Sequence, residues 1–210
     1  MSELADVARA EVHHRAERFG GTEGNELLTS AAAALLTILL LVEGATIVHL
    51  DGLRGAHMFI GLTLIPPVLL KLASTGYGFV RYYTGSPVYR AKGPPQWVLR
   101  ALAPLLVVTT VMVFVSGVWL LLLGHRSDQV LTLHKVAFIV WCGVFAVHFL
   151  AYLPRAARSL GAAWGSSARS RPLAGSGLRA MLLAASLGGG VALALALLSH
   201  ISAWHGGDGF

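Results

Sequence analysis

Residues 101–123 read ALAPLLVVTTVMVFVSGVWLLLL, and residues 130–153 read VLTLHKVAFIVWCGVFAVHFLAYL. A helix needs about 20 mostly apolar residues to cross a membrane, so each of these blocks can span it once. The stretch between them is short and polar, which makes it a tight link between two spans. The two blocks therefore predict a pair of membrane-spanning helices that run in opposite directions.

Three more apolar blocks lie elsewhere in the chain, at approximately 27–50, 56–80 and 180–200. The 210 residues are 55% apolar and 12% charged, whereas roughly a quarter of the residues of a soluble domain are charged. This composition excludes a soluble single domain. We predict an all-α membrane protein with five transmembrane helices over residues 27–200, preceded by an acidic arm at 1–26 and followed by a short tail at 201–210.

Basic residues are concentrated in the two longest connections. Nine of the 16 Lys and Arg residues, and no acidic residue, lie within 81–100 and 154–179. Positive charge between apolar blocks marks the cytoplasmic loops of a membrane protein, so it favours a membrane over nucleic acid as the partner. With five spans, the same rule places the N-terminus in the cytoplasm and the C-terminus outside, in a multi-pass protein of the cell membrane.

Ionisable and metal-binding side chains are rare inside the spans, and each is a functional candidate because its burial in lipid is costly. The single cysteine, Cys142, excludes an internal disulfide, a Cys-based zinc site and a Cys-ligated iron–sulfur cluster. The remaining candidates in the spans or at their ends are Glu43, His49, His57, Lys71, His134, Lys135, His148 and His200.

Two pairs of these candidates share one spacing. His57 and Lys71 are 14 residues apart in the second block, and His134 and His148 are 14 residues apart in the fourth. At about 100° per residue, 14 steps return to nearly the same helix face, roughly 21 Å further along the axis. The second and fourth spans run the same way across the membrane. His57 can therefore face His134 near the outer surface, while Lys71 faces His148 near the inner one.

Two matched levels of ligands on parallel helices are what two stacked haems require, because each iron takes one axial ligand from either side. The aromatic residues Phe138, Trp141 and Phe145 lie at helical spacing between the two ligand positions of the fourth span. Gly61, one turn after His57, leaves room for a flat macrocycle near the backbone. We therefore predict one or two haems held between the second and fourth spans.

Lys71 departs from this pattern, since a second histidine would be expected at its position. An ammonium group cannot ligate iron, but a neutral amine can, and burial in an apolar setting favours the neutral form. Alternatively, Lys71 pairs with a haem propionate or with Glu43, or it extends to the cytoplasmic surface and only one haem is bound.

The central spans, residues 55–153, resemble the bacterial membrane-bound b-type cytochromes of the ferric-reductase-like di-haem cytochrome b superfamily. The resemblance is carried by His57, His134, His148 and their spacing, and by the segment LHKVAF at 133–138. The loop from 76 to 95 is similar to cytochrome-like membrane proteins, some of which are associated with molybdopterin oxidoreductases. The resemblance implies that the haem is b-type and is bound in a four-helix-bundle core, with one extra helix. It also implies transfer of electrons across the membrane. The donor would be a quinol or a redox partner protein, such as an extracytoplasmic molybdopterin oxidoreductase, and the acceptor would lie on the other face.

Two other functions stay open at this point. The chain could be a haem-free protein that binds or transports a metal ion through its outer histidines, or a membrane anchor for a soluble oxidoreductase. Near the outer surface, Glu43 and His49 are candidates for a proton or quinol site, although Glu43 could also pair with a neighbouring helix. The sequence predicts no catalytic residue beyond the haem ligands.

Overall fold

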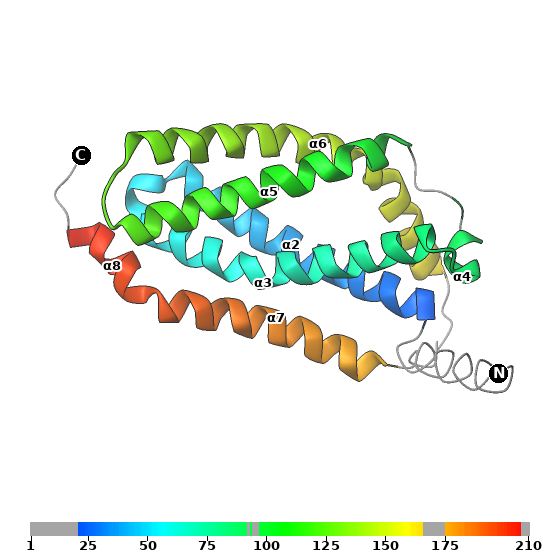
Figure 1. Ribbon diagram of the computed structural model, residues 1–210. Coiled ribbons are helices and arrows are strands. Elements are labelled where there is room, and N and C mark those ends of the chain that lie inside the picture. The colour runs from blue at the N-terminus through cyan, green and yellow to red at the C-terminus, as the bar shows by residue number, and fades with distance from the viewer. Residues whose placement is uncertain (1–20, 92, 94–96, 166–174, 207–210) are drawn as a thin grey trace, which may run out of the picture. The chain divides into compact units, whose positions relative to one another are not determined.

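The computed structural model describes residues 21–91, 93, 97–165 and 175–206, which form helices joined by short connections (Figure 1). The helices are α2 (Gly21–Val48), α3 (Leu50–Tyr83), α4 (Pro87–Arg90), α5 (Trp97–Leu123), α6 (Asp128–Gly165), α7 (Ser176–Ala196) and α8 (Leu198–Gly206). No strand occurs within these described ranges. The prediction of an all-α protein is thus confirmed for this part of the chain.

Five helices of the described chain are long and apolar enough to cross a membrane. Their spans are Gly21–Val48, Leu50–Tyr83, Arg100–Leu123, Asp128–Ala151 and Ser176–Ala196. The prediction of five transmembrane helices in a multi-pass membrane protein is confirmed at this level. The first span begins at Gly21, so the end of the predicted acidic arm is helical, and residues 1–20 of that arm lie outside the described residues.

The last apolar block, predicted as one span over 180–200, consists of two helices. α7 ends at Ala196 and α8 begins at Leu198. The amide of Leu197 still donates to the carbonyl of Leu193 at 3.1 Å, and the amide of His200 donates to the carbonyl of Leu197 at 3.0 Å. The short helix α8 takes up the start of the predicted tail, and residues 207–210 lie outside the described part.

Large apolar side chains point outward along the spans. Leu41 is 70% exposed, Ile139 is 68% exposed and Leu150 is 62% exposed. In water such surfaces would be unfavourable at this density, but in a bilayer they meet hydrocarbon and leave the helices to pack through small and polar side chains. The surfaces of these helices therefore favour contact with lipid.

The described chain divides into two compact units. The first contains the described residues within 21–42, 63–93 and 175–191, and the second contains those within 43–62, 97–165 and 192–206. Helices α2, α3 and α7 thus contribute to both units, whereas α5, α6 and α8 belong to the second.

In the first unit, α2 and α3 are joined by a polar network inside the spans. Asn25 donates through Nδ2 to the carbonyl of Ser74 at 3.0 Å, and the Thr29 hydroxyl donates to the Ser74 hydroxyl at 3.0 Å. The Ser74 hydroxyl in turn donates to the carbonyl of Lys71 at 3.0 Å. Hydrogen bonds between spans satisfy polar groups that have no access to water, so this network holds the two helices in register.

Helix α7 approaches α3 closely at one glycine of the first unit. A Cβ atom at Gly190 would overlap the carbonyl oxygen of Thr63 and lie 2.9 Å from its carbonyl carbon. At Gly188 and Gly189 of the same run, a Cβ would meet nothing within 4 Å. Only the third glycine of this Gly-Gly-Gly sequence is therefore required by the packing of the two helices.

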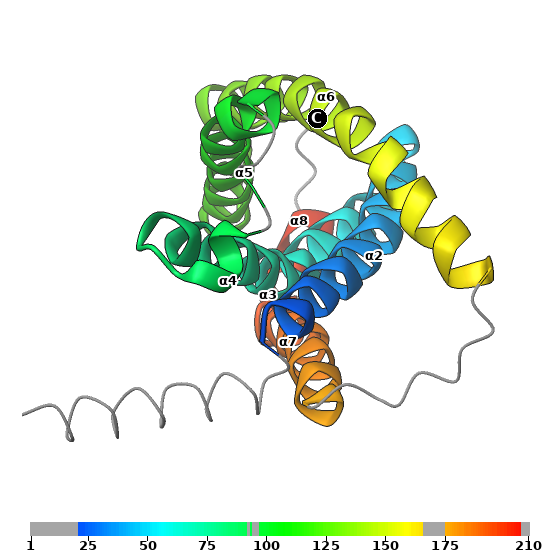
Figure 2. The same ribbon diagram turned by 90° about the vertical axis from the view of Figure 1, so that its right-hand side faces the viewer.

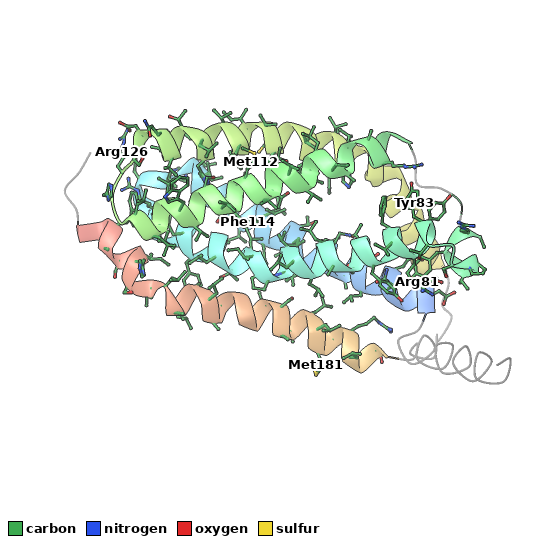
Figure 3. The ribbon with its side chains drawn as sticks, viewed as in Figure 1. Arg81, Tyr83, Met112, Phe114, Arg126 and Met181 are labelled. Atoms are coloured by element: carbon green, nitrogen blue, oxygen red, sulfur yellow. The ribbon has the colours of Figure 1, made fainter. Side chains whose placement is uncertain are left out.

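Aromatic rings gather where α3 ends and α4 begins. The rings of Tyr77 and Tyr89 meet edge to face with centroids 6.1 Å apart, and those of Phe79 and Tyr83 are 4.5 Å apart. Burial raises the pKa of the Tyr89 phenol, and the neighbouring Tyr77 adds to the rise. Figure 3 labels Arg81 and Tyr83 at this end of α3. Aromatic and basic side chains together are typical of a membrane–water interface.

In the second unit, α5 and α6 form the closest helix pair and lie side by side in both views (Figures 1 and 2). Trp141 on α6 donates through its indole nitrogen to the hydroxyl of Thr110 on α5 at 2.9 Å. α8 packs on the far end of α5, where the indole of Trp204 donates to the carbonyl of Leu121 at 3.4 Å. At the turn between α5 and α6, where Figure 3 labels Arg126, this arginine pairs with Asp128 at 2.8 Å.

Candidate functional site

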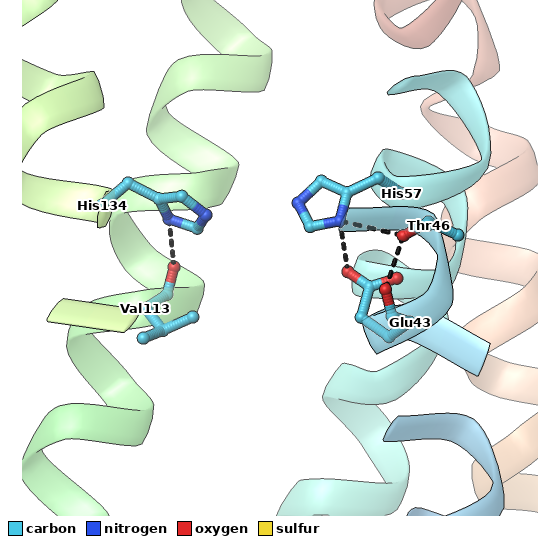
Figure 4. A network of polar contacts seen from close by, with 5 residues as sticks. All are labelled: Glu43, Thr46, His57, Val113 and His134. Atoms are coloured by element: carbon cyan, nitrogen blue, oxygen red, sulfur yellow. Dashed lines mark hydrogen bonds and ion pairs between the residues drawn. The ribbon is translucent and has the colours of Figure 1, made fainter. Parts of the chain in front are cut away.

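Two histidine rings face each other in the second unit. His57 projects from α3 and His134 from α6, and their ring centroids are 6.5 Å apart with planes inclined by 77°. Figure 4 shows the rings pointing toward one another, each with its hydrogen-bonded nitrogen turned back toward its own partners. The structure thus brings together the two residues that the sequence predicts as a pair of ligands at one level.

The ring of His57 is held by two residues of α2. Its Nδ1 lies 2.8 Å from Oε1 of Glu43 and 3.3 Å from the hydroxyl of Thr46. The Thr46 hydroxyl donates its own hydrogen to the carbonyl of Glu43 at 2.6 Å, so toward His57 it can only accept. With Glu43 ionised, both neighbours of Nδ1 are acceptors, and this nitrogen carries the hydrogen.

The ring of His134 is held in the same way by α5. Its Nδ1 lies 3.1 Å from the carbonyl of Val113 and 3.0 Å from the hydroxyl of Ser116. That hydroxyl donates to the carbonyl of Met112 at 2.6 Å, which again leaves it an acceptor toward the histidine. A Cβ at Gly117 would lie 3.1 Å from Cε1 of the ring, so the glycine lets the ring rest against α5.

Both rings consequently present Nε2 without a hydrogen bond to any described residue. A histidine that ligates a metal nearly always donates its other ring nitrogen to a carboxylate, a carbonyl or water, which fixes the tautomer and the ring orientation. His57 and His134 both have this arrangement before any metal is considered. Nε2 of each ring is the basic nitrogen that can donate an electron pair.

The spacing of the rings fits ligands on opposite sides of one metal ion. With metal–nitrogen bonds of about 2 Å, two imidazoles opposite each other have ring centroids roughly 6 Å apart. The observed 6.5 Å is close to that separation. No group of three or more His, Cys, Asp or Glu side chains that could hold a metal occurs among the described residues. A pair of axial ligands alone is the donor set that a haem needs, because the porphyrin supplies the other four nitrogens.

The second predicted pair, Lys71 and His148, falls in different units. Lys71 belongs to the first, where its Nζ donates to the carbonyl of Thr29 at 3.1 Å. His148 lies on α6 in the second unit and is half-buried. The ligand roles of these two residues, and with them the second haem, stay predictions.

The predicted aromatic residues of α6 form a continuous stack. The ring centroids of Phe138 and Trp141 are 6.2 Å apart, those of Trp141 and Phe145 are 4.9 Å apart, and those of Phe145 and Phe149 are 5.8 Å apart. All three pairs are nearly parallel, with planes inclined by 20°, 12° and 25°. The stack follows α6 from the level of His134 toward that of His148. Contact of these rings with a cofactor stays a prediction.

Gly61 on α3 lies next to the side chain of Glu43. A Cβ at this position would lie 3.5 Å from Oε1 of Glu43, an ordinary van der Waals contact. A small side chain would therefore also fit beside the Glu43 carboxylate at this position. A role toward a macrocycle stays a prediction.

The predicted proton or quinol pair, Glu43 and His49, is not joined by a hydrogen bond or ion pair within the described chain. His49 is exposed in the turn between α2 and α3, where its carbonyl accepts from the amides of Gly52 and Leu53. Leu53 has non-helical backbone angles, with φ −116° and ψ 16°, so α3 changes direction just before His57. Glu43 pairs with His57 through Oε1.

An open pocket of about 310 Å³ lies beside the turn between α5 and α6. It is lined by side chains that include Trp119, His125, Gln129 and Leu133. The imidazole of His125 lies 2.8 Å from the carbonyl of Leu123 through Nδ1. His57 and His134 are not among the residues that line it, so the pocket is separate from the paired rings.

Sequence reasoning missed the residues that hold the two rings from behind. Thr46 follows Glu43 by three residues on one face of α2, and Ser116 and Gly117 are the small pair that faces His134 from α5. A polar hydroxyl inside an apolar span was the available signal in both cases. Its partner could not be assigned without knowing which helix faces meet.

No protein-family model, curated protein or solved structure matches this chain. The resemblance to b-type cytochromes therefore rests on the residues named above alone.

Proposed function

We propose that this protein is a membrane-bound b-type cytochrome that transfers electrons, with His57 and His134 as the axial ligands of one haem. The observation that carries the proposal is the pair of facing imidazoles, 6.5 Å apart, each held by Nδ1 so that Nε2 is directed at the other. A haem bound in this way supplies reversible one-electron chemistry.

The chain's own residues would contribute three things to that chemistry. Glu43 and Thr46 orient His57, and Val113 and Ser116 orient His134. The apolar spans would limit the access of water to the site, and this influences the redox potential of a bound haem. Because protein nitrogens of both His57 and His134 would hold the haem, the site would be suited to electron transfer rather than to binding oxygen.

Electron transfer across the whole membrane needs a second redox centre, because His134 and His148 are separated along α6 by roughly 21 Å. We propose His148 as one ligand of that second redox centre; Lys71 is not proposed with it, because the carbonyl of Thr29 engages its amine. The stack of Phe138, Trp141 and Phe145 supports this proposal, since it lines the same helix between the two levels. The measured haem-to-protein ratio decides whether the protein binds one haem or two.

The partners follow from the same proposal. Electrons would come from a quinol or a redox partner protein, among which an extracytoplasmic molybdopterin oxidoreductase is one class, and leave to an acceptor on the other face. The basic stretches 81–100 and 154–179 favour a cytoplasmic side for both loops, with the N-terminus inside and the C-terminus outside.

An optical spectrum of the protein purified after haem-replete expression tests the proposal. We expect a b-type band in the reduced-minus-oxidised spectrum, lost or strongly reduced in His57→Ala and in His134→Ala. His125→Ala is the matched control, because it removes an exposed histidine that lies apart from the paired rings. Wild-type protein without Soret absorbance would reject the cytochrome assignment.

A further inference from the structure

The two facing histidines are held by unlike acceptors. Nδ1 of His134 meets a carbonyl and a hydroxyl, both neutral, whereas Nδ1 of His57 meets the carboxylate of Glu43 at 2.8 Å. We propose that Glu43 is a positioning residue which fixes His57 with Nε2 unprotonated and, through its negative charge, favours the oxidised state of the site. This inference rests on the proposed function and adds a control of its redox potential.

The carboxylate is committed to this one histidine. Its side chain is 12% exposed, and within the described residues the only ion pair it forms is with His57. Oε2 is buried and has no hydrogen-bond partner in the described part of the chain. No Lys or Arg side chain in the described chain pairs with it either. Glu43 is therefore a nearly uncompensated carboxylate inside a membrane span.

Such a group is costly in lipid unless a positive charge lies near it. The hydrogen of His57 Nδ1 provides only part of that compensation. A positively charged metal centre bound at Nε2 of the same imidazole would compensate the remaining negative charge. The hydrogen bond from Nδ1 to the carboxylate makes Nε2 more basic and so strengthens this interaction. A positively charged centre bound at Nε2 of His57 would thus explain why Glu43 lies at Nδ1 of the same ring.

The same charge has a directional effect on the redox equilibrium. Taking up one electron removes a positive charge from the site, so the carboxylate stabilises the oxidised state more than the reduced one. Two charges roughly 10 Å apart in a protein interior interact by enough to change such an equilibrium about tenfold. His134 lacks this effect because its acceptors carry no charge.

Glu43→Gln is the first test, because glutamine keeps the size of the side chain and the carbonyl acceptor for Nδ1 but removes the charge. We expect haem to be retained and the ratio of reduced to oxidised protein at a fixed ambient potential to rise roughly tenfold, which is about 59 mV for a one-electron couple. Glu43→Asp keeps the charge and should restore most of the wild-type potential. Haem retention with an unchanged midpoint potential in Glu43→Gln would overturn the inference and leave the haem assignment intact.

A second measurement needs neither haem nor a variant. Nitrogen-15 spectra of the haem-free wild-type protein, labelled in its histidine rings, should show His57 protonated at Nδ1 and bare at Nε2. Protonation of His57 at Nε2 would overturn the positioning role. Absence of haem from wild-type protein expressed with ample haem would instead reject the proposed function, so the two failures are distinguishable.

Discussion

The Nζ atom of Lys71 donates a hydrogen bond to the carbonyl oxygen of Thr29, 3.1 Å away on α2. The hydroxyl of Thr29 donates to Ser74, and the Ser74 hydroxyl donates to the carbonyl of Lys71, so the lysine is part of a closed polar network within the first unit. A lysine in a span must satisfy its amine or reach water. Here the backbone of a neighbouring helix satisfies it.

This contact leads to a prediction for Lys71→Met. Methionine keeps much of the length of the side chain and removes the amine. We expect the haem-to-protein ratio and the reduced-minus-oxidised spectrum to stay unchanged, because the amine is engaged by Thr29, and stability to change by no more than about 1 kcal/mol. Loss of about half of the bound haem would contradict this and identify Lys71 as an iron ligand.

The close approach at Gly190 predicts a packing defect in Gly190→Ala. The added methyl group would overlap the Thr63 carbonyl, so α7 must move away from α3. We expect a destabilisation of about 1–3 kcal/mol, as for other overpacked interfaces, seen as a lower midpoint of thermal unfolding in detergent. Gly189→Ala is the matched control, since its methyl group would meet nothing within 4 Å. Equal midpoints for the two variants would contradict the close contact.

The glycine behind His134 predicts a selective effect on the ligand ring. In Gly117→Ala the new Cβ would lie 3.1 Å from Cε1 of His134, closer than most side-chain contacts, so the ring must shift by a few tenths of an ångström. We expect weaker haem binding with little loss of helix content. Gly143→Ala on α6 has open space around it and should bind haem as the wild type does. The measurement is a haem titration of the apo-protein followed in the Soret band.

The hydroxyl of Ser116 predicts a weaker ligand when it is removed. Ser116→Ala takes away one of the two acceptors of His134 Nδ1 and leaves the Val113 carbonyl. Loss of an outer-shell partner typically lowers metal affinity by about 10–100-fold, and we expect the lower end of that range because one acceptor remains.

A second buried hydroxyl on α5 provides the control for that variant. Thr109 donates to the carbonyl of Leu105 at 2.8 Å and contacts neither histidine. Thr109→Ala should therefore bind haem with wild-type affinity. A similar loss of affinity in both variants would point to a general effect on α5 rather than to the orientation of His134.

Much of the fold follows from local properties of the sequence. The length of each apolar block determines that it can cross the membrane, because hydrogen bonds within a helix are the only way to satisfy the backbone in lipid. The tight link at 124–128 is likewise visible as a short polar stretch between two blocks. The break at Leu197 was not, since residues 180–200 are apolar on both sides of it.

The pairing of His57 with His134 was predictable only in part from the sequence. The 14-residue spacing and the direction of the spans were sufficient to place the two side chains at one level, since helical periodicity relates positions along one helix. The residues behind them were beyond the sequence, because a hydroxyl at Thr46 or Ser116 has no periodic partner. Nor does the sequence indicate that the carboxylate of Glu43 faces His57 rather than Lys71.

The sequence by itself determined the five membrane-spanning helices and the candidate ligands, because apolar length and helical period are properties of neighbouring residues. Only the tertiary structure decided which faces of the helices meet. Where these faces meet, Glu43 contacts His57, Ser116 contacts His134 and Gly190 lies against Thr63. These contacts arise from the packing of residues far apart in the chain. Contacts between helices depend on the shapes of both surfaces at once, so neither sequence segment contains them alone.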